Sequence, residues 1–218
     1  TEYGRYSDDL ETPNDESAEG GFLRVSRDGG SDGLGQIING GRLLSTNDAA
    51  TEAPSMDLGR YSGSHGEVLV DGVGSRLDII DTGAVNNLNY GASLAIGREG
   101  EGDMTVQTGG KVFVSGAESQ IIVGHNYGGN GSLTITGAGS VVTATGTDNY
   151  NVVGHDGQST GVMTIADGGA FEGLGLEIGR HGNGTVVITG DGSKAVISSE
   201  FGHWANVLPE DPEEEDDY

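Results

Sequence analysis

The sequence predicts an all-β protein that folds as a parallel β-helix, or β-solenoid, of about seven to eight coils with loops inserted on one side. Three observations point to this fold class. A glycine followed by a basic residue recurs along the chain, runs of alternating apolar and polar residues flank it, and 42 of the 218 residues are glycine. Repeats spaced roughly 20 to 50 residues apart are typical of solenoids.

The glycine-basic pair divides the chain into units. Its copies are Gly4-Arg5, Gly59-Arg60, Gly97-Arg98, Gly124-His125, Gly154-His155, Gly179-Arg180 and Gly202-His203, with Ser26-Arg27 as a degenerate eighth. Apolar alternation such as Leu94-Ala95-Ile96 runs into the pair, and a second run such as Leu133-Thr134-Ile135 follows it. Alternation with a period of two residues points every second side chain inward, as in a β-strand. Each unit is therefore expected to contribute short strands separated by glycine turns.

Two kinds of glycine-rich corner alternate between the strands. Gly-Gly corners lie in 39–43, 108–112 and 167–171, and Gly-x-Gly-Ser corners lie in 72–75, 137–140 and 190–193. We interpret Gly116-Ala117-Glu118-Ser119 as a variant of the second kind. Closely spaced glycines let the backbone turn where a Cβ would obstruct it, so these sites are expected to join successive sheets.

The length of the unit varies because extra residues are inserted at one place. The insertions are Thr46 to Met56, Asp81 to Asn89 and Thr145 to Asn151, and each precedes the next glycine-basic pair. They should therefore gather on one side of the rod. This side is the best candidate for a contact surface, because solenoids often bind partners through such loops.

Composition excludes several classes of function. Ten Lys and Arg residues against 34 Asp and Glu give a net charge of −24, which would repel nucleic acid and anionic membranes. No apolar run approaches the roughly 18 residues of a membrane span, so direct membrane insertion is not expected. The absence of cysteine excludes disulfides and thiol chemistry.

The two ends of the chain resemble each other. The chain is predicted to be a single solenoid segment, residues 1–218, with acidic loops at 6–20 and 205–218. Glu2-Tyr3-Gly4-Arg5-Tyr6 reappears as Glu200-Phe201-Gly202-His203-Trp204, displaced by 198 residues. One interpretation makes the chain part of a longer tandem-repeat protein, and the other is that any two coils share this much. Under the first, open strand edges predict end-to-end self-association or contact with neighbouring repeats.

Few residues are candidates for chemistry. The basic residues after the landmark glycines should form a ladder, with Asp28, Glu99 and Asp156 or turn carbonyls between them; the alternative is a histidine column that binds a transition metal. The acidic run offers oxygen ligands for a Ca²⁺ site, and the alternative is a solvated run of charges. Its residues are Glu210, Asp211, Glu213, Glu214, Glu215, Asp216 and Asp217. Leu133 follows Gly128-Gly129-Asn130-Gly131-Ser132 where the Ca²⁺-binding nonapeptide roll needs Asp. No other cofactor is expected.

A polysaccharide lyase or hydrolase is the alternative function. Such chemistry needs a basic residue beside Ca²⁺ or a group of carboxylates on one face. The chain has two lysines, Lys111 and Lys194, and no cluster of aspartates stands apart from the repeat. The nearest approach to such a cluster is Asp71, Asp78 and Asp81. We therefore expect a protein without catalytic activity.

The units resemble a known family of repeats. The segments Val123-Gly124-His125 with 131–140 and Val153-Gly154-His155 with 161–169 are similar to the β-strand repeats associated with bacterial autotransporters and PEP-CTERM proteins. The resemblance spans about residues 22 to 204. It implies an extracellular or cell-surface stalk, passenger or filament segment, structural or adhesive, with glycans or cell-surface receptors as further partners. It supplies no catalytic residue and leaves the export route open.

Overall fold

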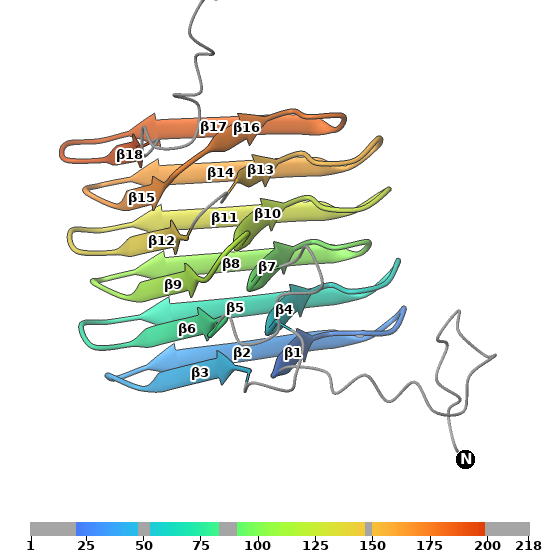
Figure 1. Cartoon of the computed structure of the whole chain (residues 1–218), viewed down its shortest axis with the longest axis horizontal. Helices are drawn as coiled ribbons and strands as arrows, with labels where there is room; N and C mark the ends of the chain where they lie inside the picture. The colour runs from blue at the N-terminus through green and yellow to red at the C-terminus, as the bar shows by residue number, and fades with distance from the viewer. Residues whose placement is uncertain (1–20, 48–52, 83–90, 147–149, 199–218) are drawn as a thin grey trace, which may run out of the picture.

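The protein is an all-β rod of stacked coils (Figure 1). A computed structural model describes residues 21–47, 53–82, 91–146 and 150–198. These residues form 18 strands in three parallel sheets of six strands each. None of these residues is helical, so they include no apolar helix long enough to cross a membrane.

Each sheet takes every third strand of the chain. Sheet A contains β1 (Phe22–Val25), β4 (Ser55–Leu58), β7 (Ser93–Ile96), β10 (Gln120–Val123), β13 (Asn151–Val153) and β16 (Leu176–Ile178). Sheet B contains β2 (Asp32–Ile38), β5 (His65–Asp71), β8 (Glu101–Gln107), β11 (Asn130–Thr136), β14 (Thr160–Ala166) and β17 (Asn183–Thr189). Sheet C contains β3 (Arg42–Thr46), β6 (Arg76–Ile80), β9 (Lys111–Ser115), β12 (Val141–Thr145), β15 (Ala170–Gly173) and β18 (Lys194–Ile197).

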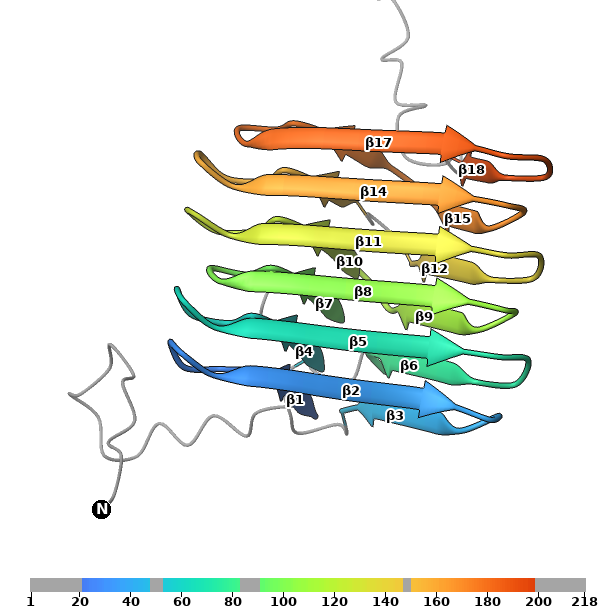
Figure 2. The ribbon, with the colours of Figure 1, turned by 180° about the vertical axis from the view of Figure 1, so that it is seen from behind.

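One strand from each sheet makes one coil, so coil 1 is β1–β3 and coil 6 is β16–β18. Figure 2 shows the sheet B strands lying parallel above one another. The predicted parallel β-solenoid is confirmed. The described part contains six coils, one for each landmark from Ser26 to Gly179. The landmarks Gly4 and Gly202, which raised the expected number to seven or eight, lie outside the described residues.

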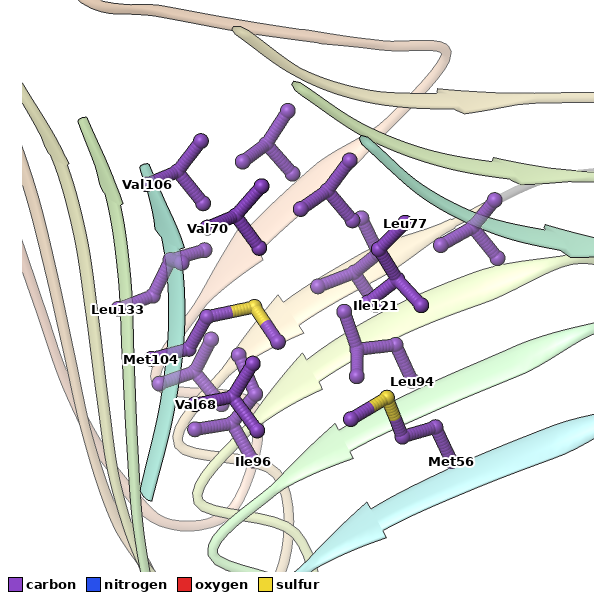
Figure 3. Close-up of a cluster of buried hydrophobic side chains, with 14 of the residues drawn as sticks. Met56, Val68, Val70, Leu77, Leu94, Ile96, Met104, Val106, Ile121 and Leu133 are labelled. Atoms are coloured by element: carbon purple, nitrogen blue, oxygen red, sulfur yellow. The ribbon is translucent and has the colours of Figure 1, made fainter. Parts of the chain in front are cut away.

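The core is a continuous column of inward side chains (Figure 3). In sheet B, Val70, Val106, Ile135 and Ile165 occupy one register position in successive coils, and all four are fully buried. Burial of such a side chain contributes roughly 1.5–3 kcal/mol. The inward side chains of one coil are buried by those of the coils above and below it. Stability therefore comes from stacking between neighbouring coils.

The corners between sheets B and C alternate as the sequence predicts. Gly-Gly corners belong to coils 1, 3 and 5, and Gly-x-Gly-Ser corners belong to coils 2, 4 and 6. Each serine Oγ accepts a hydrogen bond from a glycine N–H of the coil below. The pairs are Ser75 with Gly40 (3.0 Å), Ser140 with Gly109 (3.0 Å) and Ser193 with Gly168 (3.1 Å). The structural repeat at this corner is therefore two coils.

The Gly116-Ala117-Glu118-Ser119 segment does not belong to this series. It joins β9 to β10 and so lies at the corner between sheet C and the next sheet A strand. The interpretation of this segment as a variant of the Gly-x-Gly-Ser corner is wrong. Its Ser119 Oγ donates to the Thr145 carbonyl oxygen at 2.9 Å, a contact different from the glycine caps.

The three predicted insertions share this same corner. They connect β3 to β4, β6 to β7 and β12 to β13, each a step from sheet C to the next sheet A strand. As predicted, all three begin and end on one side of the rod, and residues 48–52, 83–90 and 147–149 between those ends lie outside the described residues. Met56 is not an insertion residue, because β4 begins at Ser55 and the Met56 side chain is buried in the core.

Candidate functional site

The basic residues of the landmark pairs form a column along the corner between sheets A and B. Backbone hydrogen bonds set their spacing: the N–H of His125 donates to Gly97, that of His155 to Gly124 and that of Arg180 to Gly154, at 2.9 to 3.0 Å. The column contains Arg27, Arg60, Arg98, His125, His155 and Arg180. The predicted ladder of basic residues is therefore present. The groups that lie between its positive charges determine how these charges are compensated.

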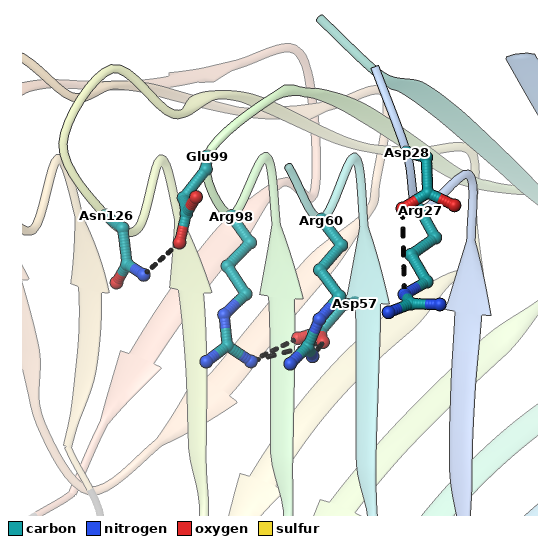
Figure 4. A network of polar contacts seen from close by, with 7 residues as sticks. All are labelled: Arg27, Asp28, Asp57, Arg60, Arg98, Glu99 and Asn126. Atoms are coloured by element: carbon teal, nitrogen blue, oxygen red, sulfur yellow. Dashed lines mark hydrogen bonds and ion pairs between the residues drawn. The ribbon is translucent and has the colours of Figure 1, made fainter. Parts of the chain in front are cut away.

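The buried carboxylate of Asp57 holds two members of the column together (Figure 4). Asp57 lies in β4 on the outward side of sheet A, and its side chain is only 2% exposed. Arg60 Nη1 of the same coil pairs with Asp57 Oδ2. Arg98 Nη1 of the next coil lies 3.1 Å from both carboxylate oxygens. Asp57 thus bridges two coils, and Arg24 of coil 1 is its register neighbour on β1.

The expected carboxylates occupy other places. Asp28 lies 3.8 Å from Arg27, the residue next to it, in an exposed ion pair. Glu99 accepts a hydrogen bond from Asn126 Nδ2 at 3.1 Å. Asp156 Oδ1 lies 2.9 Å from His155 Nδ1. Among the described pairs, these three carboxylates therefore do not bridge arginines of successive coils, and Asp57, which the sequence analysis missed, does.

Asp78 repeats this arrangement on sheet C. Its side chain is fully buried on β6, between the Arg42 Nε of coil 1 at 2.6 Å and the Arg76 Nε of its own coil. Arg42, Arg76 and Lys111 are register neighbours in successive coils, so Asp78 offsets the repulsion of a cationic column. Coil 2 therefore supplies both buried acidic bridges that hold arginines of adjacent coils in the described part of the chain.

The histidines of the column are packed against each other. The rings of His125 and His155 meet edge to face, with centroids 5.1 Å apart. Burial, with the nearby positive charge of Arg98, lowers the pKa of His125 to about 4. Its Nδ1 is buried and has no hydrogen-bond partner within the described part of the chain. In this surrounding, the neutral imidazole of His125 acts as a packing group in a cationic column.

The depressed pKa of His125 predicts a rod that loses stability in mild acid. An unfolded chain takes up this proton near its ordinary pKa of about 6.5, whereas the folded chain resists protonation until about 4. Stability is therefore complete above about pH 6.5 and falls by up to about 3 kcal/mol as the pH drops to 4. Urea unfolding of the wild-type protein and His125→Asn between pH 4 and 8 measures this difference.

The matched control is His181→Asn, because His181 lies at the same corner but is exposed. We expect His125→Asn to remove the part of the free energy of unfolding that is lost in acid. We expect His181→Asn to leave that part unchanged. Parallel pH curves for the wild-type protein and His125→Asn would contradict it.

A second group of ionisable residues lies at the start of the sheet B strands. Ligand atoms of His65, Glu101 and Asp103 all fall within 4.8 Å of one another. His65 Nε2 is 3.1 Å from Asp103 Oδ2, and this hydrogen bond is the main reason why the pKa of His65 is raised. These residues are half-exposed or exposed, and their geometry is that of an imidazolium held by surface carboxylates. The sequence analysis did not identify this group, whose members become neighbours only through strand register.

The other predicted sites have different outcomes. The predicted Ca²⁺ ligands Glu210 to Asp217 lie outside the described residues, so that site stays a prediction. Of the three aspartates considered for glycan chemistry, Asp71 ends β5, Asp78 is bridged to two arginines, and Asp81 accepts a hydrogen bond from Asn47 at 2.8 Å. Asp78 and Asp81 thus already have partners from the neighbouring coil.

An open hollow lies on the outside of the corner between sheets B and C. It is lined by Val73, Gln107, Thr108, Thr136, Gly137, Ala138 and Asp167. Among these lining residues Asp167 supplies the one carboxylate, whereas glycoside hydrolysis ordinarily requires two. The lining comes from the corners of coils 2 to 5.

Comparison with known proteins assigns the chain to no family. No protein-family model matches the chain, and no curated protein or solved structure is significantly similar to it.

Proposed function

We propose that this chain is a structural or adhesive segment of an extracellular stalk, passenger or filament, and that it acts without catalysis. The observation that carries the proposal is the unbroken apolar column through six coils in register. Such a column makes a stiff rod whose surface repeats along its length, which suits a spacer or a scaffold.

The surface of the rod supports the same role. The charge of −24 keeps an exposed rod soluble and discourages contact with nucleic acid and anionic membranes. The insertions all belong to the corner between sheets C and A, which makes this side the best candidate for binding glycans or cell-surface receptors. The similarity of coils 4 and 5 to bacterial surface repeats supports an extracellular or cell-surface location.

A panel of pectin, alginate and related polysaccharides tests the proposal against a glycan-active enzyme. We expect no release of reducing ends or unsaturated uronates by the full chain, with or without Ca²⁺. Binding without turnover on a glycan array supports an adhesive role, and neither binding nor turnover supports a purely structural one. Turnover that is lost in Asp71→Asn, with unchanged unfolding, would overturn the proposal.

A further inference from the structure

The last described coil leaves its inward side chains partly exposed. At the upper end in Figure 1, the inward side chains Ile178, Ile188 and Ile197 of coil 6 are 54%, 49% and 45% exposed. The register partners Val153 and Ile165, one coil lower, are fully buried. Coil 6 therefore presents an unfinished core and three strands, each with one edge that has no further strand in the described part of the chain.

We propose that coil 1 of a second copy of this chain covers coil 6, head to tail and in register, so that the copies form linear stacks. This inference rests on the proposed structural function and names its partner. Three features of coils 1 and 6 support it: the parity of their corners, a corner glycine with no close contact beneath it in the single chain, and complementary charge.

The parity of the corners favours a head-to-tail junction. Gly-Gly and Gly-x-Gly-Ser corners alternate, and the described coils begin with the first kind and end with the second. Placing coil 1 of a second copy on coil 6 therefore continues the alternation, as coil 3 does on coil 2 and coil 5 does on coil 4. At those internal junctions the Gly72 N–H donates to the Gln107 carbonyl oxygen and the Gly137 N–H to Ala166. In the proposed stack the equivalent bond runs from Gly190 to Ile38 of the second copy.

Gly41 lacks, in the single chain, the close contact with the coil below that its counterparts make. It occupies the corner position of Gly110 and Gly169, where an added Cβ would lie 2.4 Å from the carbonyl oxygen of Val70 or Ile135 in the coil below. At Gly41 the nearest atom to an added Cβ is the Ile38 carbonyl oxygen at 3.1 Å, and the backbone φ is not positive. In the proposed stack the carbonyl oxygen of Ile188 would lie beneath Gly41 of the next copy, as that of Val70 lies beneath Gly110.

The outward side chains of the two ends complement each other in charge. Glu177 of coil 6 and Arg24 of coil 1 occupy the same register column of sheet A, the column that contains Asp57. Stacking places the carboxylate of Glu177 beside the guanidinium of Arg24. Lys194 and Arg42 would also become neighbours, and Asp78, which already pairs with Arg42, offsets this repulsion as it does in the column Arg42, Arg76 and Lys111. An upper end facing another upper end would instead run its strands antiparallel to those of the partner and would lose this register.

Gly41→Ala separates stacking from folding. Serine stands directly before the sheet C strand in coils 2, 4 and 6, although in a corner one residue longer, so the fold accepts a Cβ before this strand. At Gly41 the nearest atom to that Cβ within the chain is the Ile38 carbonyl oxygen at 3.1 Å, a contact that a small shift relieves. We expect the melting temperature of the dilute variant to stay within about 2 °C of the wild type. In sedimentation velocity and negative-stain microscopy of the full chain, we expect concentration-dependent linear stacks for the wild type and at least tenfold weaker association for Gly41→Ala.

Glu177→Lys and Gly157→Ala complete the experiment. Glu177→Lys places like charges at the junction and should weaken stacking, whereas Gly157→Ala, in an exposed turn with no atom within 4 Å of the added Cβ, should leave it unchanged. A wild-type protein that stays monomeric at millimolar concentration, or a closed dimer unaffected by Gly41→Ala, would overturn the inference. Glycan turnover by stacks of normal length would overturn the proposed function alone.

Discussion

Replacing Gly161 with alanine is expected to destabilise the rod by about 4 kcal/mol, near the upper end of single-substitution effects. Gly161 is the second residue of β14, and an added Cβ would lie 2.1 Å from the Val123 carbonyl oxygen and 2.5 Å from the Gly154 nitrogen. Both atoms belong to backbone that is hydrogen-bonded between coils, so neither can move without opening the junction between coils 4 and 5. Urea denaturation of the wild type and the variant measures the loss.

Gly157→Ala is the matched control for this effect. It makes the same chemical change in the same coil, but at an exposed turn where an added Cβ meets nothing within 4 Å. We expect its free energy of unfolding to lie within about 0.5 kcal/mol of the wild type. Equal losses for the two variants would show that chain flexibility, rather than contact between coils, determines the effect.

The glycine column that contains Gly161 explains how unequal coils stay in register. Every described coil has a glycine as the second residue of its sheet B strand: Gly33, Gly66, Gly102, Gly131, Gly161 and Gly184. Length changes occur before this position, in the turn, and after sheet C, in the insertions. The corner between sheets B and C changes by one residue, because Gly-x-Gly-Ser corners are longer than Gly-Gly corners. The sheet B strands are therefore all seven residues long and pair along their full length.

The sequence predicts this fold well because its signals are local. Alternation such as Leu133-Thr134-Ile135 marks a strand and its inward face, and the glycine-rich corners mark where the chain changes sheets. The alternation of the two corner types was also visible, since each type carries its own residues. The contact between the two corner types appears only in the structure, because it depends on which corners are neighbours. In each contact a serine Oγ accepts a hydrogen bond from a glycine N–H one coil below.

The candidate site was harder to predict because its residues meet across coils. Asp57 precedes Leu58 and Gly59 in the chain, and the residues at its register position in coils 3, 4 and 5 are Ala95, Ile122 and Val152. This contrast was a usable signal, because a carboxylate in a column of apolar residues needs a buried partner. The sequence analysis instead looked for carboxylates beside the basic residues, where Glu99 and Asp156 lie, and so placed the bridge in the turn rather than on the strand.

Removing the charge of Asp57 is expected to cost about 3 kcal/mol of folding free energy, because a buried ion pair that loses one partner leaves the other uncompensated. In Asp57→Asn the guanidinium groups of Arg60 and Arg98 would remain over the outward side of sheet A, with side chains only 18% and 31% exposed. Urea unfolding at pH 7 measures the loss. A cost below about 0.5 kcal/mol would mean that water, rather than Asp57, compensates the two arginines.

A triple variant separates the contribution of the ion pairs from that of packing. Asp57→Ala with Arg60→Met and Arg98→Met gives coil 2 the apolar character that Ala95, Ile122 and Val152 give this column in the next three coils. Because charge and partner are removed together, we expect the triple variant to be more stable than Asp57→Asn and close to the wild type. If it is as unstable as Asp57→Asn, the bridge between coils 2 and 3 contributes net stability that apolar packing cannot replace. The stacking of these coils would then depend on charge as well as on the core.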